Sequence, residues 1–466
     1  MKDYSSESLS HDPLHGYIRF TSPAAGQGNE VTERELIDHA WLQRLRQIHQ
    51  LQTAWFVFPT AEHTRFQHVL GVMHLASQAA AALDDSLREQ CTDAPSRGYV
   101  EALLRITGLL HDVGHGPFGH FFDEHFLRRF GLTHETLGAH IVRHELGDMI
   151  RGIRRTPNGR LEPGEQLDPE QVAFLMTRPA INAAHPQPRW LVLLRSLFCG
   201  IYTVDNMDFV LRDAFMSGYS TRAFDLQRLL HYTFFSERGL TVHDRGLDSL
   251  VRFMTVRAEL FRSVYFHRTV RAIDLSLADL FSQCGNLIFP GDPREHLDAY
   301  RRFTEWSLLV DVADWSRAED ERRRQLAAGW EAILARKIPW KMLCQRHLVY
   351  GENDVERSSI FSDAALVERQ LRQLLPAELA NYPLRVDVAR HIYRPHTAGP
   401  AEGQNFLYES SRSRLRPLTD DALFRRLPAS HRICRVYATD STHRNEVAAA
   451  LDQLLGGGGG DDLTNM

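Results

Sequence analysis

The sequence is poor in cysteine and almost devoid of lysine. The cysteines stand far apart, without a C-x-x-C pair, at Cys91, Cys199, Cys284, Cys344 and Cys434. This spacing excludes a disulfide framework and a zinc knuckle, and we expect the cysteines to fill space in the core. Of the 54 basic residues 51 are arginine, an excess that a coding bias explains more simply than a phosphate-binding role does.

Long apolar runs, an apolar leader and an excess of positive charge are also missing. The run LVLLRSLFCGIYTV (191–204) is interrupted by Arg195 and is too short to span a bilayer. The first residues, MKDYSSESLSHDP, do not place an apolar stretch after a basic one, as a secretory signal would. The formal net charge is −5, so the charge balance does not indicate nucleic-acid binding. We therefore expect a cytoplasmic protein without a membrane partner.

Hydrophobic periodicity predicts a mainly α-helical fold. Apolar residues recur at steps of three and four in segments such as 65–83 and 247–266. After about Pro376 the pattern changes: 382–395, 404–410 and 431–439 are typical of strands, and 444–455 of a closing helix. We expect an N-terminal segment (1–30), a helical core (31–285) with a surface insertion (152–170), a helical extension (286–375), a small α+β subdomain (376–455) and a flexible glycine-rich tail (456–466).

The stretch LLHDVGHGPFGH (109–120) places ionisable side chains at the end of an apolar helix. The preceding VEALLRITGLL predicts a helix that delivers His111 and Asp112 at its carboxyl end, and we expect Gly114 to end it in a left-handed cap. Neighbouring helical residues point about 100° apart, so both side chains converge on one point only where the helix ends. The negative end of the helix dipole also favours a cation there.

Two further side chains are candidates to complete a metal site with this pair. A helical bundle builds metal sites from facing helices, and His68 and Asp205 each lie in a segment that is otherwise apolar on that side. Two histidines and two aspartates suit iron, manganese or zinc. Taken singly, each of these residues is just as typical of a core histidine or a helix-capping aspartate.

Five segments with characteristic residues follow one another in the first half of the chain. They are DPLHGYIRF (12–20), LQRLRQIHQL (42–51), VFPTAEHTRFQHVLGVMHLA (57–76), LLHDVGHGPFGH (109–120) and YTVDNMDFVLRDAF (202–215). In this combination they resemble the HD-domain phosphohydrolases, most of all the deoxynucleoside triphosphate triphosphohydrolases. The resemblance covers about 12–281 and implies a catalytic HD-domain helical bundle, with no room before Asp12 for the sterile-alpha-motif domain of the vertebrate enzyme.

The resemblance also implies roles for individual residues. It implies one divalent metal ion, iron, manganese or zinc, held by His68, His111, Asp112 and Asp205, with Mg²⁺ as a further candidate alongside the triphosphate. It implies that protons are handled by His115, His120, Asp123 and His134. It implies that the substrate is bound by Arg65, Gln50, Leu51, Phe209, Asp213, Arg257, Tyr265 and Arg268.

The match departs from the family at the sugar and at the phosphates. Phe209 stands where the family has a tyrosine beside the sugar, and Phe261 where the vertebrate enzyme has a histidine near the phosphates. An unpaired sugar hydroxyl buried against Phe209 would cost about 1 to 3 kcal/mol, which is enough to change substrate preference. The nucleotide and its base are therefore left open.

Only half of the residues that would form an activator site can be recognised in the sequence. Asp38, Gln43 and Arg46 match residues that read a guanine nucleotide in the vertebrate enzyme, whereas Ser8 and His11 replace a lysine and an asparagine. The resemblance thus implies a nucleotide activator in some form, or constitutive activity in its place. It also implies a homo-oligomer, a dimer or a tetramer.

Three functions remain open on the sequence alone. The leading hypothesis is metal-dependent hydrolysis of deoxynucleoside triphosphates to deoxynucleoside and triphosphate, by attack of water on the α-phosphorus. The second is an HD phosphohydrolase that acts on another phosphate ester, such as a nucleoside monophosphate, a signalling nucleotide or a nucleic-acid end. The third is a nucleotide-sensing or nucleic-acid-binding protein without turnover, against which the intact metal ligands and proton-handling residues argue.

Overall fold

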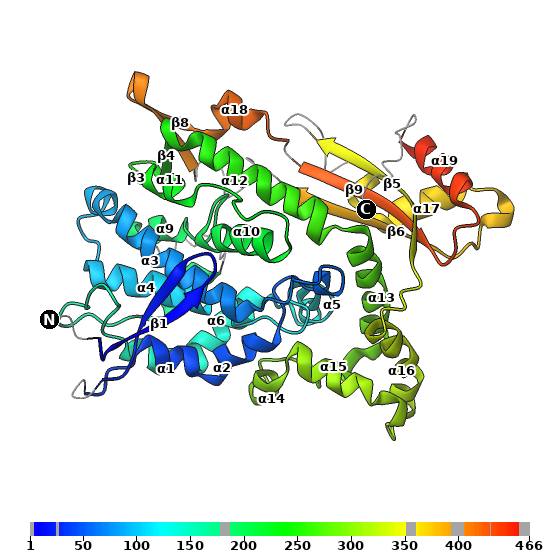
Figure 1. Ribbon diagram of the computed structural model, residues 1–466, viewed down its shortest axis with the longest axis horizontal. Helices are drawn as coiled ribbons and strands as arrows, with labels where there is room; N and C mark the ends of the chain where they lie inside the picture. Colours follow the sequence, from blue (N-terminus) through cyan, green and yellow to red (C-terminus); the bar gives the residue numbers. More distant parts are fainter. Residues whose placement is uncertain are drawn as a thin grey trace. The chain divides into compact units, whose positions relative to one another are not determined.

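The chain forms two compact units in a computed structural model, which describes residues 4–24, 28–177, 187–350, 360–392, 405–428 and 430–455. The first unit comprises Met1–Arg257, Asn286–Asp311 and Thr397–Phe424, and the second Ala258–Gly285, Val312–His396 and Arg425–Met466. The fold is mainly α-helical, as predicted (Figure 1). None of the helices within the described residues is long and apolar enough to cross a membrane.

The first unit is organised around the long helix α3 (Arg65–Gln90), which packs against α4 (Arg97–Leu110) and α10 (Val204–Met216). Each begins at a hydroxyl N-cap: Thr64 forms a capping box, and the Ser96 and Thr203 side chains accept backbone N–H bonds. Further helices of this unit are α1 (Glu33–Asp38), α2 (Ala40–Gln43), α5 (His120–His125), α6 (His134–His144), α7 (Gly147–Gly152), α8 (Pro169–Met176), α9 (Arg189–Arg195), α11 (Leu226–His231), α12 (Leu247–Leu260), α14 (Leu297–Arg302) and α15 (Glu305–Ala313).

Two glycines let the central helices approach closely. A Cβ at Gly108 of α4 would lie 3.1 Å from the backbone of Val72 and Met73 in α3. A Cβ at Gly71 of α3 would lie 1.9 Å from the Asp208 carboxylate of α10. The three helices therefore meet with little side-chain volume between them, and α4 is buried from Gly98 to Leu110.

Strands occur in two places in the first unit. β1 (Glu7–Asp12) and β2 (Gly16–Thr21) form an antiparallel hairpin. A second sheet has the order β3 (Thr233–Ser236), β4 (Gly239–His243), β7 (Asn405–Glu409) and β8 (Arg414–Pro417), with β4 and β7 parallel.

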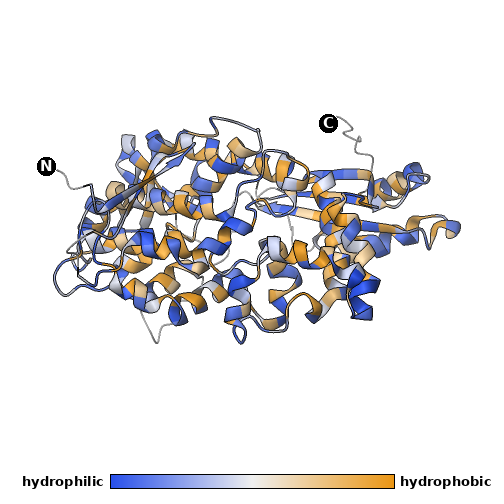
Figure 2. Cartoon of the chain, turned by 60° about the horizontal axis from the view of Figure 1, so that its bottom comes forward, coloured by the Kyte–Doolittle hydropathy of each residue, from blue (hydrophilic) through white to orange (hydrophobic). Residues whose placement is uncertain are grey.

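The second unit holds a three-stranded antiparallel sheet in the order β5 (Lys341–Tyr350), β9 (Ser430–Ala438), β6 (Leu384–Ile392). The helices α17 (Ala364–Leu374) and α19 (Arg444–Leu454) share a hydrophobic core with this sheet. Side chains of β6 and β9 bind α13 (Arg268–Cys284): Asp387 pairs with Arg271 at 2.6 Å, and the Tyr437 hydroxyl donates to the Arg268 carbonyl at 2.8 Å. The unit also contains α16 (Glu321–Leu334). Figure 2 shows polar and apolar residues mixed along individual helices, as amphipathic packing requires.

The predicted strands and the closing helix are present, but the strands do not form one contiguous subdomain. β7 pairs with β4 of the first unit, whereas β6 and β9 belong to the second. The strand β5 lies in 286–375, where only helices were expected. It was missed because its buried residues, Leu343 to Arg346, are consecutive rather than alternating. The predicted domain boundaries stay a prediction, and the expected tail (456–466) lies outside the described residues.

A buried ion pair ties the N-terminal hairpin to α4. The Arg105 guanidinium contacts the Glu33 carboxylate at 2.5 and 2.9 Å, and both side chains are buried. Glu33 also accepts the Thr21 backbone N–H at 2.9 Å, and Arg105 donates to the Arg19 carbonyl at 2.8 Å.

We expect Arg105→Ala to lower the free energy of unfolding by about 3 to 5 kcal/mol, because it leaves the Glu33 carboxylate buried without a countercharge. The matched control is Arg143→Ala, which breaks an exposed pair with Glu170 and should cost about 1 kcal/mol or less. Urea unfolding measures both. Equal losses in the two variants would contradict the assignment.

His49 links two loops to the first residue of α15. Its Nδ1 lies 2.7 Å from the Glu305 carboxylate and its Nε2 lies 3.0 Å from Glu62, while Glu305 accepts the Phe118 backbone N–H at 3.2 Å. Burial lowers the pKa of His49, but the hydrogen bonds to Glu305 and Glu62 outweigh burial and raise it above its ordinary value.

A pKa that is raised in the folded state contributes stability below the unfolded pKa of about 6.5 and loses it as the pH rises through the folded value. We therefore expect the wild-type free energy of unfolding to fall as the pH rises above about 6.5, and this component to be absent in His49→Gln. The exposed His231 gives the control variant His231→Gln, which should keep the wild-type dependence. An unchanged pH profile in His49→Gln would rule out the assignment.

Candidate functional site

The four predicted metal ligands come together in the first unit from the three central helices. His68 lies in the first turn of α3, His111 and Asp112 follow α4, and Asp205 lies in the first turn of α10. The His68 Nε2 atom is 3.1 Å from the Asp205 carboxylate and 3.9 Å from Asp112. The His111 Nε2 atom is 3.4 Å from Asp112 and 3.6 Å from Asp205. These four side chains are called the ligand cluster below.

The end of α4 directs His111 into the cluster. His111 is the C-cap residue in right-handed helical conformation, and its backbone N–H donates to the Thr107 carbonyl. The expected left-handed cap at Gly114 is wrong, since Gly114 is not among the residues of positive φ. A Cβ there would lie 2.1 Å from the His134 carbonyl and 2.5 Å from the Gly138 nitrogen, so this glycine permits close packing against α6 instead.

The donor set fits a divalent cation. The His111 Nδ1 atom lies 2.8 Å from the Gly108 carbonyl and must donate to it, so Nε2 is the nitrogen that offers a lone pair whenever the ring is neutral. That Nε2 atom is buried and has no hydrogen-bond partner among the described residues. Ligand atoms of His68, His111 and Asp112 all lie within 4.8 Å of one another. Two imidazoles and two carboxylates suit iron, manganese or zinc and do not select one of them.

Charges in the cluster are strongly coupled. Burial lowers the pKa of His68, but hydrogen bonds to Asp205 and Asp208 outweigh it and raise this pKa to about 10. Burial raises the pKa of Asp205, but the two imidazoles of the cluster hold it well below its usual range. Without a cation the imidazoles thus take its place as the positive partners of the carboxylates.

The four predicted proton-handling residues form a second group beside the cluster. Asp123 lies 2.5 Å from the His134 Nδ1 atom and 3.3 Å from the His120 Nδ1 atom. His115 stacks on His134 with ring centroids 3.7 Å apart, and its Nε2 atom is 3.3 Å from Asp112. These four residues are called the relay group below, and their ligand atoms also lie close enough together to hold an ion.

The relay group contains one imidazole that is held neutral. Burial and the positive charges of Arg65 and His134 lower the pKa of His115 well below its ordinary value. Burial raises the pKa of Asp123, but the imidazoles around it hold it well below its usual range. The His120 side chain is 69% exposed, so it is the relay residue open to a ligand from solvent.

Of the predicted substrate-binding residues, Arg65 touches the ligand cluster. Its Nη1 atom donates to Asp112 at 2.6 Å, and its Nε atom is buried without a hydrogen-bond partner in the described part of the chain. A Cβ at Gly119 would lie 2.3 Å from Arg65, and Gly119 has a φ of 55°. Both the lack of space and the positive φ therefore require glycine at this turn.

Two of the predicted sugar-binding residues, Gln50 and Asp213, are connected through His63, which the sequence did not indicate. The Gln50 backbone N–H donates to the His63 carbonyl at 3.0 Å, and the His63 Nε2 atom lies 2.7 Å from Asp213. Leu51 and Asp213 are buried, and Phe209 is half-buried. A buried histidine in the run TAEHTRF carries no signal that separates it from a core histidine.

The predicted phosphate-binding residues divide between the units. Arg257 is buried in the first unit and donates to the Ile201 carbonyl at 2.9 Å. Tyr265 and Arg268 belong to the second unit, where Tyr265 packs edge-on against Phe261 with centroids 4.7 Å apart. Phe261 in turn stacks on His391 at 4.1 Å.

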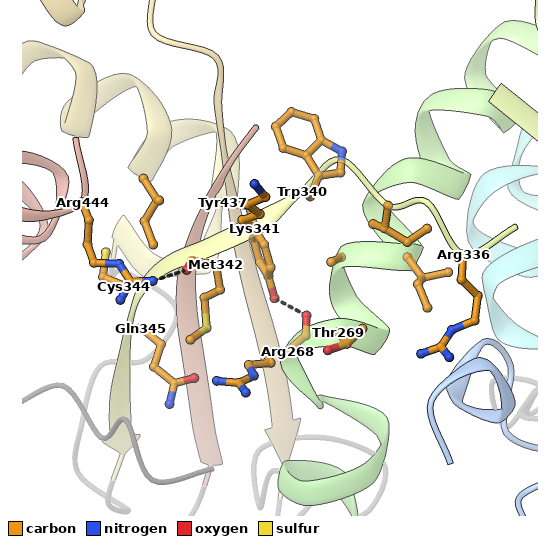
Figure 3. Close-up of a pocket in the computed structure, with 14 residues that line it drawn as sticks. Arg268, Thr269, Arg336, Trp340, Lys341, Met342, Cys344, Gln345, Tyr437 and Arg444 are labelled. Carbon is orange, nitrogen blue, oxygen red and sulfur yellow. Dashed lines mark hydrogen bonds between the residues drawn. The ribbon is translucent and has the colours of Figure 1, made fainter. Parts of the chain in front are cut away.

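Arg268 lines a cavity of about 410 Å³ in the second unit. Its described lining includes four cationic side chains and no carboxylate (Figure 3). The charged and aromatic members are Arg268, Arg336, Lys341, Arg444, Trp340 and Tyr437. This cavity is suited to an anion.

Two of the three predicted activator residues are in contact. The Arg46 Nε atom donates to the Gln43 amide oxygen at 2.8 Å, and the Arg46 guanidinium lies 3.6 Å from the centroid of the Phe66 ring. Asp38 is exposed and pairs with Arg34 instead.

A further arginine, Arg44, supports the loop that follows the ligand cluster. It donates to the carbonyls of His115 at 2.8 Å, Val113 at 3.2 Å and Phe303 at 2.7 Å. The side chain is buried, although in LQRLRQIHQL it has the spacing of a surface charge. Only the tertiary structure identifies it.

Comparisons with known proteins agree with this geometry. Residues 65–173 match the family model of the HD domain. The deoxynucleoside triphosphate triphosphohydrolase SAMHD1 of Gallus gallus is 27% identical over 457 residues, 92% of this chain and 71% of that protein. Its homologue in Dictyostelium discoideum is 26% identical over 336 residues, 70% of this chain and 59% of that protein. The uncharacterized protein YwfO of Bacillus subtilis is 28% identical over 338 residues, 68% of each chain.

A solved structure has the same fold. The crystal structure of a hypothetical protein from Aquifex aeolicus superimposes with a TM-score of 0.68 at 24% identity, covering 96% of this chain and all of that chain. His68, His111 and Asp112 lie within the matched HD domain, and Asp205 follows it in the chain; the chain is a hydrolase that carries an HD domain and resembles the deoxynucleoside triphosphate triphosphohydrolases.

Proposed function

We propose that the chain is a metal-dependent deoxynucleoside triphosphate triphosphohydrolase that releases deoxynucleoside and inorganic triphosphate. The observation that carries the proposal is that Asp112 of the ligand cluster contacts both Arg65, whose guanidinium suits a phosphate, and His115 of the relay group. The relatives named as triphosphohydrolases support the choice of substrate.

His68, His111, Asp112 and Asp205 would hold one divalent ion. When bound, the ion supplies Lewis-acid chemistry and makes water beside it easier to deprotonate. Because one imidazole and two carboxylates already surround the unpartnered His111 Nε2 atom, the chain needs little rearrangement to accept it.

Arg65 is placed to hold the α-phosphate. One nitrogen of its guanidinium is committed to Asp112, which fixes the plane of the group. The remaining donors of the fork suit two phosphate oxygens. Gly119 leaves room for that approach, because any side chain there would collide with the guanidinium.

The relay group would supply a proton to the leaving group. Attack of water on the α-phosphorus expels the nucleoside 5′-oxygen, which leaves only if it is protonated. His120 is the exposed imidazole of the group, and Asp123 holds both it and His134 by their Nδ1 atoms, so the Nε2 atom of His120 is free to face a ligand. Imidazoles exchange protons near neutral pH and suit this role.

A second candidate function is hydrolysis of another nucleotide phosphate ester. It is favoured by Phe209, which offers no hydroxyl to the sugar, and by Phe261, whose ring is already stacked on His391.

We further propose a homo-oligomer and a nucleotide activator that contacts Gln43 and Arg46. The test is the rate of hydrolysis of one pure deoxynucleotide. If added GTP or a second deoxynucleotide does not change this rate, the proposed activator is ruled out.

The reaction product separates the two functions. Metal-loaded protein is incubated with each of the four deoxynucleoside triphosphates, and with the four ribonucleotides beside them, and the products are identified by phosphorus NMR. We expect triphosphate and deoxynucleoside, because the cluster and relay group serve attack on the α-phosphorus. Orthophosphate or pyrophosphate as the product would transfer the assignment to another phosphate ester.

Removal of the ligand pair should remove metal and turnover together. For the double variant His111→Ala, Asp112→Ala we expect metal content near zero and hydrolysis lowered more than about 100-fold, since loss of an outer partner alone costs 10 to 100-fold. The control is the same change at the partly exposed pair His243 and Asp244, which lies outside the cluster. Metal analysis and turnover that survive in the first double variant would disprove the metal-dependent mechanism.

A further inference from the structure

One buried carboxylate outside the ligand cluster binds a cluster ligand directly. Asp208 lies one turn after Asp205 in α10 and is fully buried. Its Oδ2 atom is 2.8 Å from the His68 Nδ1 atom, and its Oδ1 atom is 2.7 Å from the His15 Nε2 atom. Arg212 donates to both oxygens, at 2.8 and 3.0 Å.

This contact determines which nitrogen of His68 can bind a cation. The Asp208 carboxylate can only accept, so Nδ1 of His68 carries the proton toward it. The opposite nitrogen, Nε2, is the one that faces Asp205 and Asp112. A carboxylate behind a ligating histidine fixes the ring orientation and makes the histidine a better ligand.

The space for this carboxylate is made by the neighbouring helix. A Cβ at Gly71 would lie 1.9 Å from the Asp208 Oδ1 atom and 2.5 Å from the Arg212 guanidinium. Gly71 stands three residues after His68 in α3, so the same helix supplies the ligand and the gap behind it. Any other residue at this position would displace Asp208.

Asp208 is itself held from the N-terminal hairpin. The Nη1 atom of Arg212 donates to the Asp12 Oδ2 atom at 2.8 Å. The other oxygen of Asp12 accepts the backbone N–H groups of Leu14 and His15, at 2.9 and 3.0 Å, and thereby shapes the turn between β1 and β2. The turn therefore contacts Asp208 in two ways. Asp12 binds Arg212, which binds Asp208, and the His15 ring binds Asp208 directly.

We propose that Asp208 is a positioning residue for the metal ligand His68 and that the turn from Asp12 to His15 completes the metal centre by holding Asp208. The N-terminal hairpin is then part of the centre, although it supplies no ligand. This inference rests on the proposed metal centre and concerns metal retention, not the identity of the substrate.

The test measures metal release from the full chain. Wild type and Asp208→Asn are loaded with Mn²⁺, and its transfer to excess EDTA is timed. Because the amide keeps one acceptor oxygen and places an NH2 group where the carboxylate accepts from Arg212 or His68, we expect release about 10 to 100-fold faster in Asp208→Asn. The matched control is Asp387→Asn, a buried carboxylate paired with Arg271 but without contact to a cluster ligand or to the N-terminal hairpin; it should release Mn²⁺ at the wild-type rate.

The variant His15→Gln decides the case if Asp208→Asn does not fold. It removes one contact to Asp208 and leaves the Arg212 pair, so we expect release several-fold faster than in wild type and non-additive effects when both changes are combined. Wild-type release rates in both variants, or an equal acceleration in Asp387→Asn, would overturn the proposal. If the wild-type chain retains Mn²⁺ but does not hydrolyse deoxynucleotides, the proposed function is overturned and the inference about Asp208 is not.

Discussion

The structure depends on how closely α3 can approach its two neighbours. Gly108 and Gly71 remove the side chains that would separate α3 from α4 and from α10. This close packing brings His68, the residues that follow α4 and the first turn of α10 to one point. The ligand cluster is therefore a consequence of backbone packing as much as of ligand identity.

Close packing also buries charge, and arginines compensate three of the buried carboxylates. Asp112 contacts Arg65, Asp208 contacts Arg212, and Glu33 contacts Arg105. Without its arginine, each of these charges would cost several kcal/mol. Two of these pairs lie directly around the cluster, which gives the centre a rigid electrostatic frame. Among the four residues of the relay group, His120 alone is exposed, so this imidazole is the one in contact with solvent.

The sequence predicted the four residues of the ligand cluster but not the residues that hold them. His68, His111, Asp112 and Asp205 could be predicted because they stand in motifs with a metal-binding logic and a family resemblance. Arg44, His63 and Asp208 could not, because their roles arise from contacts between segments far apart in the chain. Gly114 shows the same limit at short range: its spacing was typical of a helix cap, whereas its actual role is set by the carbonyl of His134. The strand β5 was missed because neighbours from β9 and from helices on one face bury consecutive residues.

The most direct test of the central claim is the position of the metal in a crystal of the full chain, located by anomalous scattering at the absorption edge of the bound element. The account predicts one strong peak per chain, bonded to the Nε2 atoms of His68 and His111 and to the carboxylates of Asp112 and Asp205. Two results would contradict it. One is a peak bonded to His115, His120, Asp123 and His134 with no peak at the ligand cluster. The other is no peak at the ligand cluster in crystals that are shown by metal analysis to contain the element.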